Sequence, residues 1–347
     1  MIDIPLLKKI CETPGAPGFE YPIRKVLIEE IKGLVDEYHI DNMGNLIAIK
    51  KGTGDKKVGV TAHMDEISFI VSHIDKDGFI RFQPLGGFDP KTLTAQRVII
   101  HGKEDIIGVM GSKPIHIMSP EERKKMPDLK DYFIDTGMSG EKVKEIVSIG
   151  DPITRERELI EMGDCVNSKS LDNRVSVYIL VELLRELKGK TLPYDLYAMF
   201  TVQEEVGLRG AQTAAFSAGV DFGINVDVTI AFDVPGAQPQ EMVSKLGEGT
   251  AIKILDGTSI CDHRMVKYLK EIASKNDIKY QMEILAMGGT DTAYLQRAGN
   301  GSIAGALSIP TRHIHQVIEM ANKEDIRLTI DLLREAVSSL DSYNWEH

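Results

Sequence analysis

Cysteine is scarce in this sequence, and the few residues present lie far apart. They are Cys11, Cys165 and Cys261, an odd number with no CxxC pair. A disulfide framework is built from an even set of closely spaced cysteines, and a thiolate zinc site from paired CxxC-type motifs. The pattern indicates neither and predicts three inert thiols.

Basic runs and long apolar runs are also missing. The chain has 41 Lys and Arg against 52 Asp and Glu, a formal charge of −11, and no dense basic segment. This composition argues against nucleic acid or an anionic membrane as the main partner. The opening MIDIPLLKKICETPG meets a lysine pair and then Pro14 before a signal-peptide core or a spanning helix is complete. We therefore expect a cytoplasmic protein.

Motifs for nucleotide binding and for serine or cysteine nucleophiles are absent as well. No GxSxG elbow occurs, and Cys165 has neither a papain-like nor a caspase-like setting. The glycine runs GGFDP, from Gly86, and MGGTDTA, around Gly288, match no Walker or dinucleotide fingerprint. A nucleotide cofactor and a covalent nucleophile are thus poorly supported.

The order of apolar segments predicts an α/β protein with an insertion. After residue 165, helical patterns such as LDNRVSVYILVELLREL alternate with strand patterns such as DLYAMFTV. This alternation favours a mostly parallel sheet covered by helices on both faces. Residues 70–164 instead hold short strand-like runs between Asp-Gly and Gly-Gly turns, typical of a small β barrel or sandwich. We expect one α/β domain from residues 1–68 and 165–347, interrupted by a β-rich domain at 69–164.

Polar residues of one chemical kind follow the apolar strands. His63 follows VGVTA, Glu204 and Glu205 follow LYAMFTVQ, Asp227 lies within INVDVT, and His315 follows ALSIPTRHI. Ligands of open α/β sheets gather outside the carboxyl ends of the strands, so these side chains are expected to converge. Histidine with several carboxylates suits Zn²⁺, Co²⁺ or Mn²⁺ better than an all-oxygen Ca²⁺ cage.

A pair of metal ions additionally needs a bridging ligand. A carboxylate binds one ion through each oxygen and holds two cations roughly 3.5–4 Å apart, so that a water between them becomes a nucleophile. Asp172 in SKSLDNR, directly before a helix, is the candidate for this bridge.

Several of these residues have a plainer interpretation. His63 and Asp65 share a face of an extended segment, so Asp65 either orients the imidazole or only caps the loop. Adjacent Glu204 and Glu205 point opposite ways, which suits one metal ligand and one proton carrier but also a solvated turn. Asp227 is either a ligand or a turn residue, because a charge buried in an apolar strand needs compensation.

The end of the chain leaves two further questions open. His313 and His315 have the same i, i+2 spacing, and only one of them is needed as a ligand. A substrate pocket that prefers acidic residues needs a cation, for which Lys245, Arg264 and Arg312 are candidates. The spacing decides neither question.

Six motifs in fixed order give the sequence a family resemblance. They are AHMDEISFIV, LDNR, VQEEVGLRGA, VDVT, GGTDTAYLQ and IPTRHIH. With this set the chain resembles the M42 family of metallo-aminopeptidases, nearly from end to end, including TPGAPGFE near the start and DNMGNLIA from Asp41. Six ordered motifs are far more specific than any one of them.

The resemblance implies a role for each candidate residue. One ion is expected on His63, Asp172 and Asp227 and the other on Asp172, Glu205 and His315, with Asp65 orienting His63 and Glu204 as the general base. The resemblance implies that the two ions are Zn²⁺ or Co²⁺, and that the Asp172-Asn173 peptide bond is cis. One departure is His313, where the family has a tyrosine; family register still favours His315 as the ligand.

The resemblance also implies an activity and an assembly. A member of this family removes N-terminal residues from short peptides, with a metal-bridging water activated by the general base, and its β-rich domain serves in homo-oligomers from dimers to dodecamers. Some relatives are labelled endoglucanases, a role that needs two carboxylates flanking a glycosidic bond. That alternative ranks second because it leaves the histidines and the bridge unexplained. A non-catalytic oligomeric scaffold is the third hypothesis.

Overall fold

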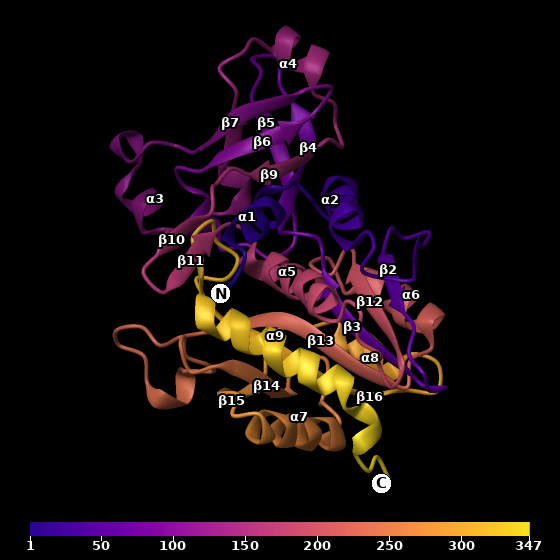
Figure 1. Ribbon diagram of the computed structural model, residues 1–347. Coiled ribbons are helices and arrows are strands. Elements are labelled where there is room, and N and C mark those ends of the chain that lie inside the picture. Colours follow the sequence, from indigo (N-terminus) through magenta and orange to yellow (C-terminus); the bar gives the residue numbers. More distant parts are fainter. Residues whose placement is uncertain (347) are drawn as a thin grey trace.

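The computed structural model describes residues 1–346, which form a large sheet and a separate closed barrel (Figure 1). The sheet has 11 strands, with β14 and β15 attached beside β16. Its main path, in spatial order, is β1 (Glu37–Ile40), β2 (Leu46–Lys50), β12 (Asp195–Thr201), β3 (Lys57–His63), β13 (Phe222–Ile230), β16 (Ile303–Arg312), β17 (Glu319–Asn322), β11 (Cys165–Ser168) and β10 (Ile160–Met162). The attached strands are β14 (Thr250–Leu255) and β15 (Tyr280–Ile284).

The sheet is parallel at its centre and between the two attached strands. β12, β3, β13 and β16 run parallel to one another, as do β14 and β15. The remaining pairs, including β2 with β12 and β16 with β17, are antiparallel. The prediction of a mostly parallel sheet is therefore right for the centre and wrong for the flanks, because an apolar strand pattern carries no information about strand direction.

Helices cover both faces of the central strands to different extents. One face packs against α5 (Leu171–Glu186), α7 (His263–Lys275) and α9 (Lys323–Ser338), with α1 (Ile4–Glu12) and α2 (Tyr21–Ile31) outside α5. The other face packs against α6 (Arg209–Ala218) and α8 (Thr292–Arg297). Strand β2 shows the division, since Leu46 and Ala48 belong to the first core and Ile47 and Ile49 to the second.

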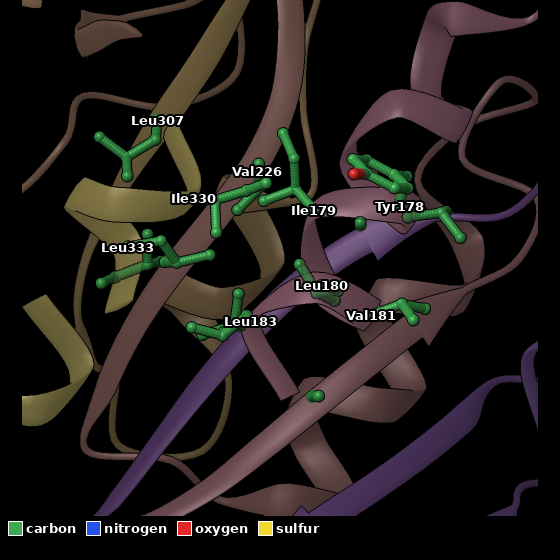
Figure 2. Close-up of a cluster of buried hydrophobic side chains, with 14 of the residues drawn as sticks. Tyr178, Ile179, Leu180, Val181, Leu183, Val226, Leu307, Ile330 and Leu333 are labelled. Carbon is green, nitrogen blue, oxygen red and sulfur yellow. The ribbon is translucent and has the colours of Figure 1, made fainter. Parts of the chain in front are cut away.

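Helix α5 is the centre of the larger core. Figure 2 shows its Ile179 and Leu183 facing Val226 of β13 and Leu307 of β16, with Ile330 of α9 alongside. Fully burying each such side chain stabilises the fold by about 1.5–3 kcal/mol. This packing fixes the start of α5, where Asp172 lies, against the carboxyl ends of the central strands.

The barrel has a core of its own. Its strands are β4 (Ser68–Ile74), β5 (Ile80–Leu85), β8 (Phe133–Asp135), β7 (Asp105–Gly111), β6 (Arg97–His101) and β9 (Pro152–Arg155), with the helices α3 (Pro120–Lys124) and α4 (Gly140–Ile146) between them. The inserted β-rich block at 69–164 stays a prediction as a domain division. Strand pairing places the barrel between Ser68 and Arg155, whereas β10 hydrogen-bonds into the large sheet. None of the helices within residues 1–346 has the length and apolarity needed to span a bilayer.

Candidate metal centre and active site

The predicted site residues meet at one edge of the sheet. His63 is the last residue of β3 and lies beside Thr201, the last residue of β12, in the parallel register. Glu204 and Glu205 lie in the turn just after β12, and Asp227 lies near the end of β13 opposite Ser308 of β16. The carboxyl ends of these parallel strands share an edge, as the sequence pattern predicts.

A first cluster surrounds His63. Its Nε2 lies 3.3 Å from Oδ1 of Asp172 and 3.8 Å from Oδ1 of Asp227. All three residues are buried, and one atom from each falls within 4.8 Å of the others. This is the spacing of a group that can hold a metal ion.

A second cluster uses the other oxygen of the same aspartate. Nε2 of His315 lies 3.3 Å from Oδ2 of Asp172 and 3.5 Å from Oε2 of Glu205. These three residues also fall within the 4.8 Å limit. Asp172 thus belongs to both groups, one oxygen to each, which is the arrangement that a bridging carboxylate requires.

Asp65 supports both His63 and the glutamate pair. Its Oδ1 lies 3.4 Å and its backbone oxygen 3.2 Å from Nδ1 of His63, so it faces the ring nitrogen that points away from the clusters. Its carboxylate also accepts from the backbone N–H groups of Glu204 at 3.0 Å and Glu205 at 3.1 Å. Asp65 therefore fixes the turn that carries the pair.

The two glutamates differ in their relation to the clusters. Glu205 is part of the second cluster, whereas Glu204 belongs to neither, although its Oε2 lies 3.8 Å from Nε2 of His63. Both side chains line the same cavity. The geometry is compatible with the predicted division of roles, which stays a prediction.

The segment after β16 distinguishes the two histidines. His313 is exposed and lies in neither cluster, whereas His315 lines the cavity. The two residues have φ angles of 59° and 65°, so the segment is not extended and the i, i+2 rule does not apply to it. The Asp172-Asn173 peptide bond is cis, as the resemblance implies.

The cluster concentrates carboxylates in a buried place. Burial would lower the pKa of His63, but the Glu204 and Asp172 carboxylates raise it well above its ordinary value. Burial together with Asp172 raises the pKa of Glu205 to about 8, and burial raises the pKa of Asp227 to about 7. The pKa of Glu204 is also raised well above its ordinary value, mainly by burial.

The donor set fits divalent metal ions. Oε1 of Glu205 is buried and has no hydrogen-bond partner among residues 1–346, a costly arrangement for an isolated carboxylate. Several carboxylates with two histidines and no cysteine match the preferences of Zn²⁺ and Co²⁺. Cations between these groups would offset the repulsion among the buried acids.

The clusters open into a cavity of about 650 Å³. Its wall combines metal-cluster residues with an apolar part, formed by Val228, Ile230, Leu285, Met287 and Ile314. None of Lys245, Arg264 and Arg312 lines it, so their selection as pocket cations is wrong. The two arginines are ion-paired elsewhere, Arg264 with Asp262 at 2.7 Å and Arg312 with Asp233 at 2.6 Å.

The chain is similar to one protein family along most of its length. The family model described as M42 glutamyl aminopeptidase matches residues 44–332. The chain belongs to the M42 family. Three relatives align along almost the whole chain. A putative aminopeptidase of Acetivibrio thermocellus is 44% identical and aligns over 96% of this chain and 97% of its own length. The lysyl aminopeptidase of Pyrococcus furiosus is 35% identical, with 98% of each chain covered, and the glutamyl aminopeptidase of Lactococcus lactis is 31% identical, with 97% and 96% covered.

Solved structures of M42-like proteins share the fold. An aminopeptidase from the archaeon Desulfurococcus kamchatkensis has a TM-score of 0.93 at 37% identity, covering 97% of this chain and 94% of that one. The dodecamer PhTET1-12s has a TM-score of 0.88 at 31% identity, with 97% and 99% covered. A Thermotoga maritima protein titled endoglucanase has a TM-score of 0.80 at 31% identity, with 96% of each chain covered.

Three buried charged residues of this M42 peptidase escaped the sequence analysis. Asp291, from the GGTDTAYLQ motif, accepts from Oγ1 of Thr201 at 2.6 Å and carries charge close to His63. Lys253 lines the cavity, and Glu319 binds two ligand residues through their backbones. The reasoning that selected Asp227, a charge within an apolar strand, applies equally to Lys253 in TAIKIL and would have found it.

The metal-free form of this M42 peptidase should lose stability as the pH rises from about 5 to about 8. Folding raises the pKa of Glu205 from 4.5 to about 8 and that of Asp227 from 3.8 to about 7. A group with a raised pKa stabilises the fold below its unfolded pKa, and this contribution disappears as the pH passes the folded pKa. Burial opposes protonation of His315, but Asp172 raises its pKa from 6.5 to about 9. The contribution of His315 to stability therefore also falls as the pH rises.

Urea denaturation of chelator-treated protein at pH 5 and pH 8 measures this effect. We expect a loss on the order of a few kcal/mol at the higher pH. Added zinc should reverse the trend, because metal ligands bind in their deprotonated forms. A metal-free protein that is equally stable at both pH values contradicts the electrostatic description of the cluster.

Proposed function

We propose that this M42 peptidase removes N-terminal residues from short peptides with the help of two divalent ions, zinc or cobalt. One observation carries the proposal. Asp172 presents one oxygen to each of two ligand groups, and Glu204 lies beside them without belonging to either. Family membership supports the same reaction class.

The two groups of residues would each hold one ion. His63, Asp172 and Asp227 form the first, and Asp172, Glu205 and His315 the second. Bound there, the ions supply Lewis acidity, which polarises the substrate carbonyl and lowers the pKa of water. Asp65 holds the His63 ring with Nε2 toward Asp172 and Asp227, where it would be available to an ion.

Glu204 would move the protons of the reaction. Its carboxylate takes a proton from the water that attacks the carbonyl carbon, and then gives it to the nitrogen of the leaving amine. Burial raises the pKa of Glu204 above its ordinary value, which is the direction required of a base that later acts as an acid.

The surroundings favour a substrate with a free amino terminus. Two carboxylates of the cavity wall, Glu204 and Asp256, belong to neither ligand group, so their charge stays available to attract a positively charged α-amino group. The apolar wall from Val228 to Ile314 gives the adjoining side chain a place to bind. A peptide with a blocked amino terminus loses the first of these interactions.

A panel of aminoacyl arylamides tests the proposal. Substrates with a free α-amino group should be hydrolysed and their acetylated counterparts should not, and a chelator should abolish turnover until zinc or cobalt is restored. Equal hydrolysis of acetylated substrates, or full turnover in chelator, rejects the proposal. If the protein releases reducing ends from β-glucan even in the presence of chelator, the endoglucanase role is supported instead. In that role the two histidines of the clusters have no function.

Self-association is part of the proposal. The barrel strand β7 exposes Ile107 and Val109, with 58% and 47% of their surface open to solvent, as apolar surface for a second copy. The PhTET1-12s relative is titled as a dodecamer, which supports an assembly without fixing its size here. The cytoplasmic location expected from the sequence stays a prediction.

A further inference from the structure

A single buried carboxylate joins the two chain segments that carry the second cluster. Glu319, the first residue of β17, is fully buried. Its Oε2 accepts from the backbone N–H of Asp172 at 2.9 Å, and its Oε1 accepts from the backbone N–H of His315, also at 2.9 Å. One side chain therefore sets the distance between the start of α5 and the segment that follows β16.

His315 depends on this contact more than the other ligand candidates do. It lies beyond the end of β16 at Arg312, and its φ of 65° is left-handed, a conformation that residues with a Cβ rarely adopt. Its side chain is 36% exposed, against 10% for Asp172, so surrounding side chains confine it less. The bond to Glu319 is thus a main restraint on its backbone.

Glu319 is itself held from two sides. Its backbone pairs with Ser168 in the β11–β17 ladder, and its carbonyl oxygen accepts from Nδ2 of Asn167 at 3.0 Å. The guanidinium of Arg155, from barrel strand β9, is buried and acts on the Glu319 carboxylate as the opposing charge. Nε and Nη2 of Arg155 have no hydrogen-bond partner among residues 1–346.

We propose that Glu319 is a positioning residue, which holds Asp172 and His315 at the separation that binding of the second ion requires. The inference rests on the proposed two-metal function. Groups behind metal ligands orient those ligands, and their loss commonly weakens metal binding by about 10–100-fold. Glu319 acts through two ligand backbones at once and contacts no substrate.

The variant Glu319→Gln tests the inference in the full-length protein. A glutamine has one acceptor oxygen and a donor amide in place of the second, so one of the two N–H groups loses its partner. Equilibrium dialysis and visible absorption measure how metal-stripped protein binds cobalt. In the variant, the affinity of the weaker of the two sites for cobalt should fall by about 10–100-fold. Turnover should fall at limiting cobalt and recover at saturating cobalt, which a general loss of folding does not allow.

Asp325→Asn is the matched control. Asp325 is another buried carboxylate that accepts two backbone N–H bonds, from Gly247 at 2.7 Å and Gly249 at 2.8 Å, and it does not line the cavity. Its variant should change stability without changing cobalt affinity. If Glu319→Gln fails to fold, Glu319→Asp carries the test, because its shorter side chain keeps the charge but does not span both N–H groups.

The outcomes separate this inference from the proposed function. Wild-type affinity for both ions in Glu319→Gln, or an equal loss in Asp325→Asn, overturns the positioning role while the two-metal function stands. A wild-type chain that binds no cobalt overturns both. Selective loosening of one site, reversed by excess cobalt, supports the inference.

Discussion

Replacing Glu204 by glutamine should lower kcat by about 10²–10⁴-fold while the protein keeps its fold and its metal ions. The substitution preserves size and removes only the ability to take up and release a proton. Since Glu204 lies outside both ligand groups, metal content should stay unchanged. Steady-state kinetics on an aminoacyl arylamide, with metal analysis of the same sample, measures both effects.

The neighbouring residue provides the matched comparison. Glu205→Gln makes the same chemical change one position away, but Glu205 belongs to the second ligand group. This variant should lose affinity for one ion, and excess metal should restore part of its turnover. Excess metal should do nothing for Glu204→Gln. Undiminished hydrolysis by Glu204→Gln, or rescue of that variant by added metal, contradicts the assignment of the pair.

Asp172→Asn should remove measurable turnover and reduce the bound metal below that of any other single ligand variant. Asparagine has one neutral acceptor oxygen where the carboxylate offers one charged oxygen to each group. One ion therefore loses its ligand, and the other keeps only a neutral oxygen in place of a charged one. The backbone N–H of residue 172 can still donate to Glu319, so the start of α5 should keep its place.

His315→Ala is the comparison for this prediction. It removes a ligand from the second group only and should leave one ion bound through His63, Asp172 and Asp227. Plasma mass spectrometry after dialysis counts the ions in each variant. Two ions retained by Asp172→Asn, or none retained by His315→Ala in a folded protein, contradicts a shared carboxylate between the two groups.

Sequence reasoning located the site because strand ends can be read from hydrophobicity. The apolar runs before His63 and Glu204 end where β3 and β12 end, and Asp227 interrupts β13 near its end. Parallel strands bring such ends to one edge, so convergence followed from the fold class. Asp172 was found instead by its own motif, since no strand precedes it directly.

Other features depend on contacts that local patterns do not contain. The bond between Glu319 and the backbone of Asp172 joins residues 147 positions apart, and the charge of Arg155 acts on Glu319 from the barrel. A single acid after a loop gives no sign of such partners. The antiparallel flanks of the sheet were missed for a related reason, because an apolar run such as that of β2 is compatible with either strand direction.

The helix faces were easier to predict than the segment after β16. The apolar residues of LDNRVSVYILVELLREL recur with helical spacing, so the sequence alone predicts α5 as a helix that packs on a sheet. His313 and His315 instead adopt positive φ, so their side chains do not share the one face that extended spacing assigns to them. Tertiary contacts rather than local preference fix the backbone there.

The central claim is that two ions share Asp172 in a working aminopeptidase. The most direct test is the number of zinc or cobalt ions per subunit in dialysed, active wild-type protein, counted by plasma mass spectrometry. The account predicts two ions per subunit, and activity that disappears as they are removed. A protein that hydrolyses free aminoacyl arylamides at full rate with one ion or none contradicts it.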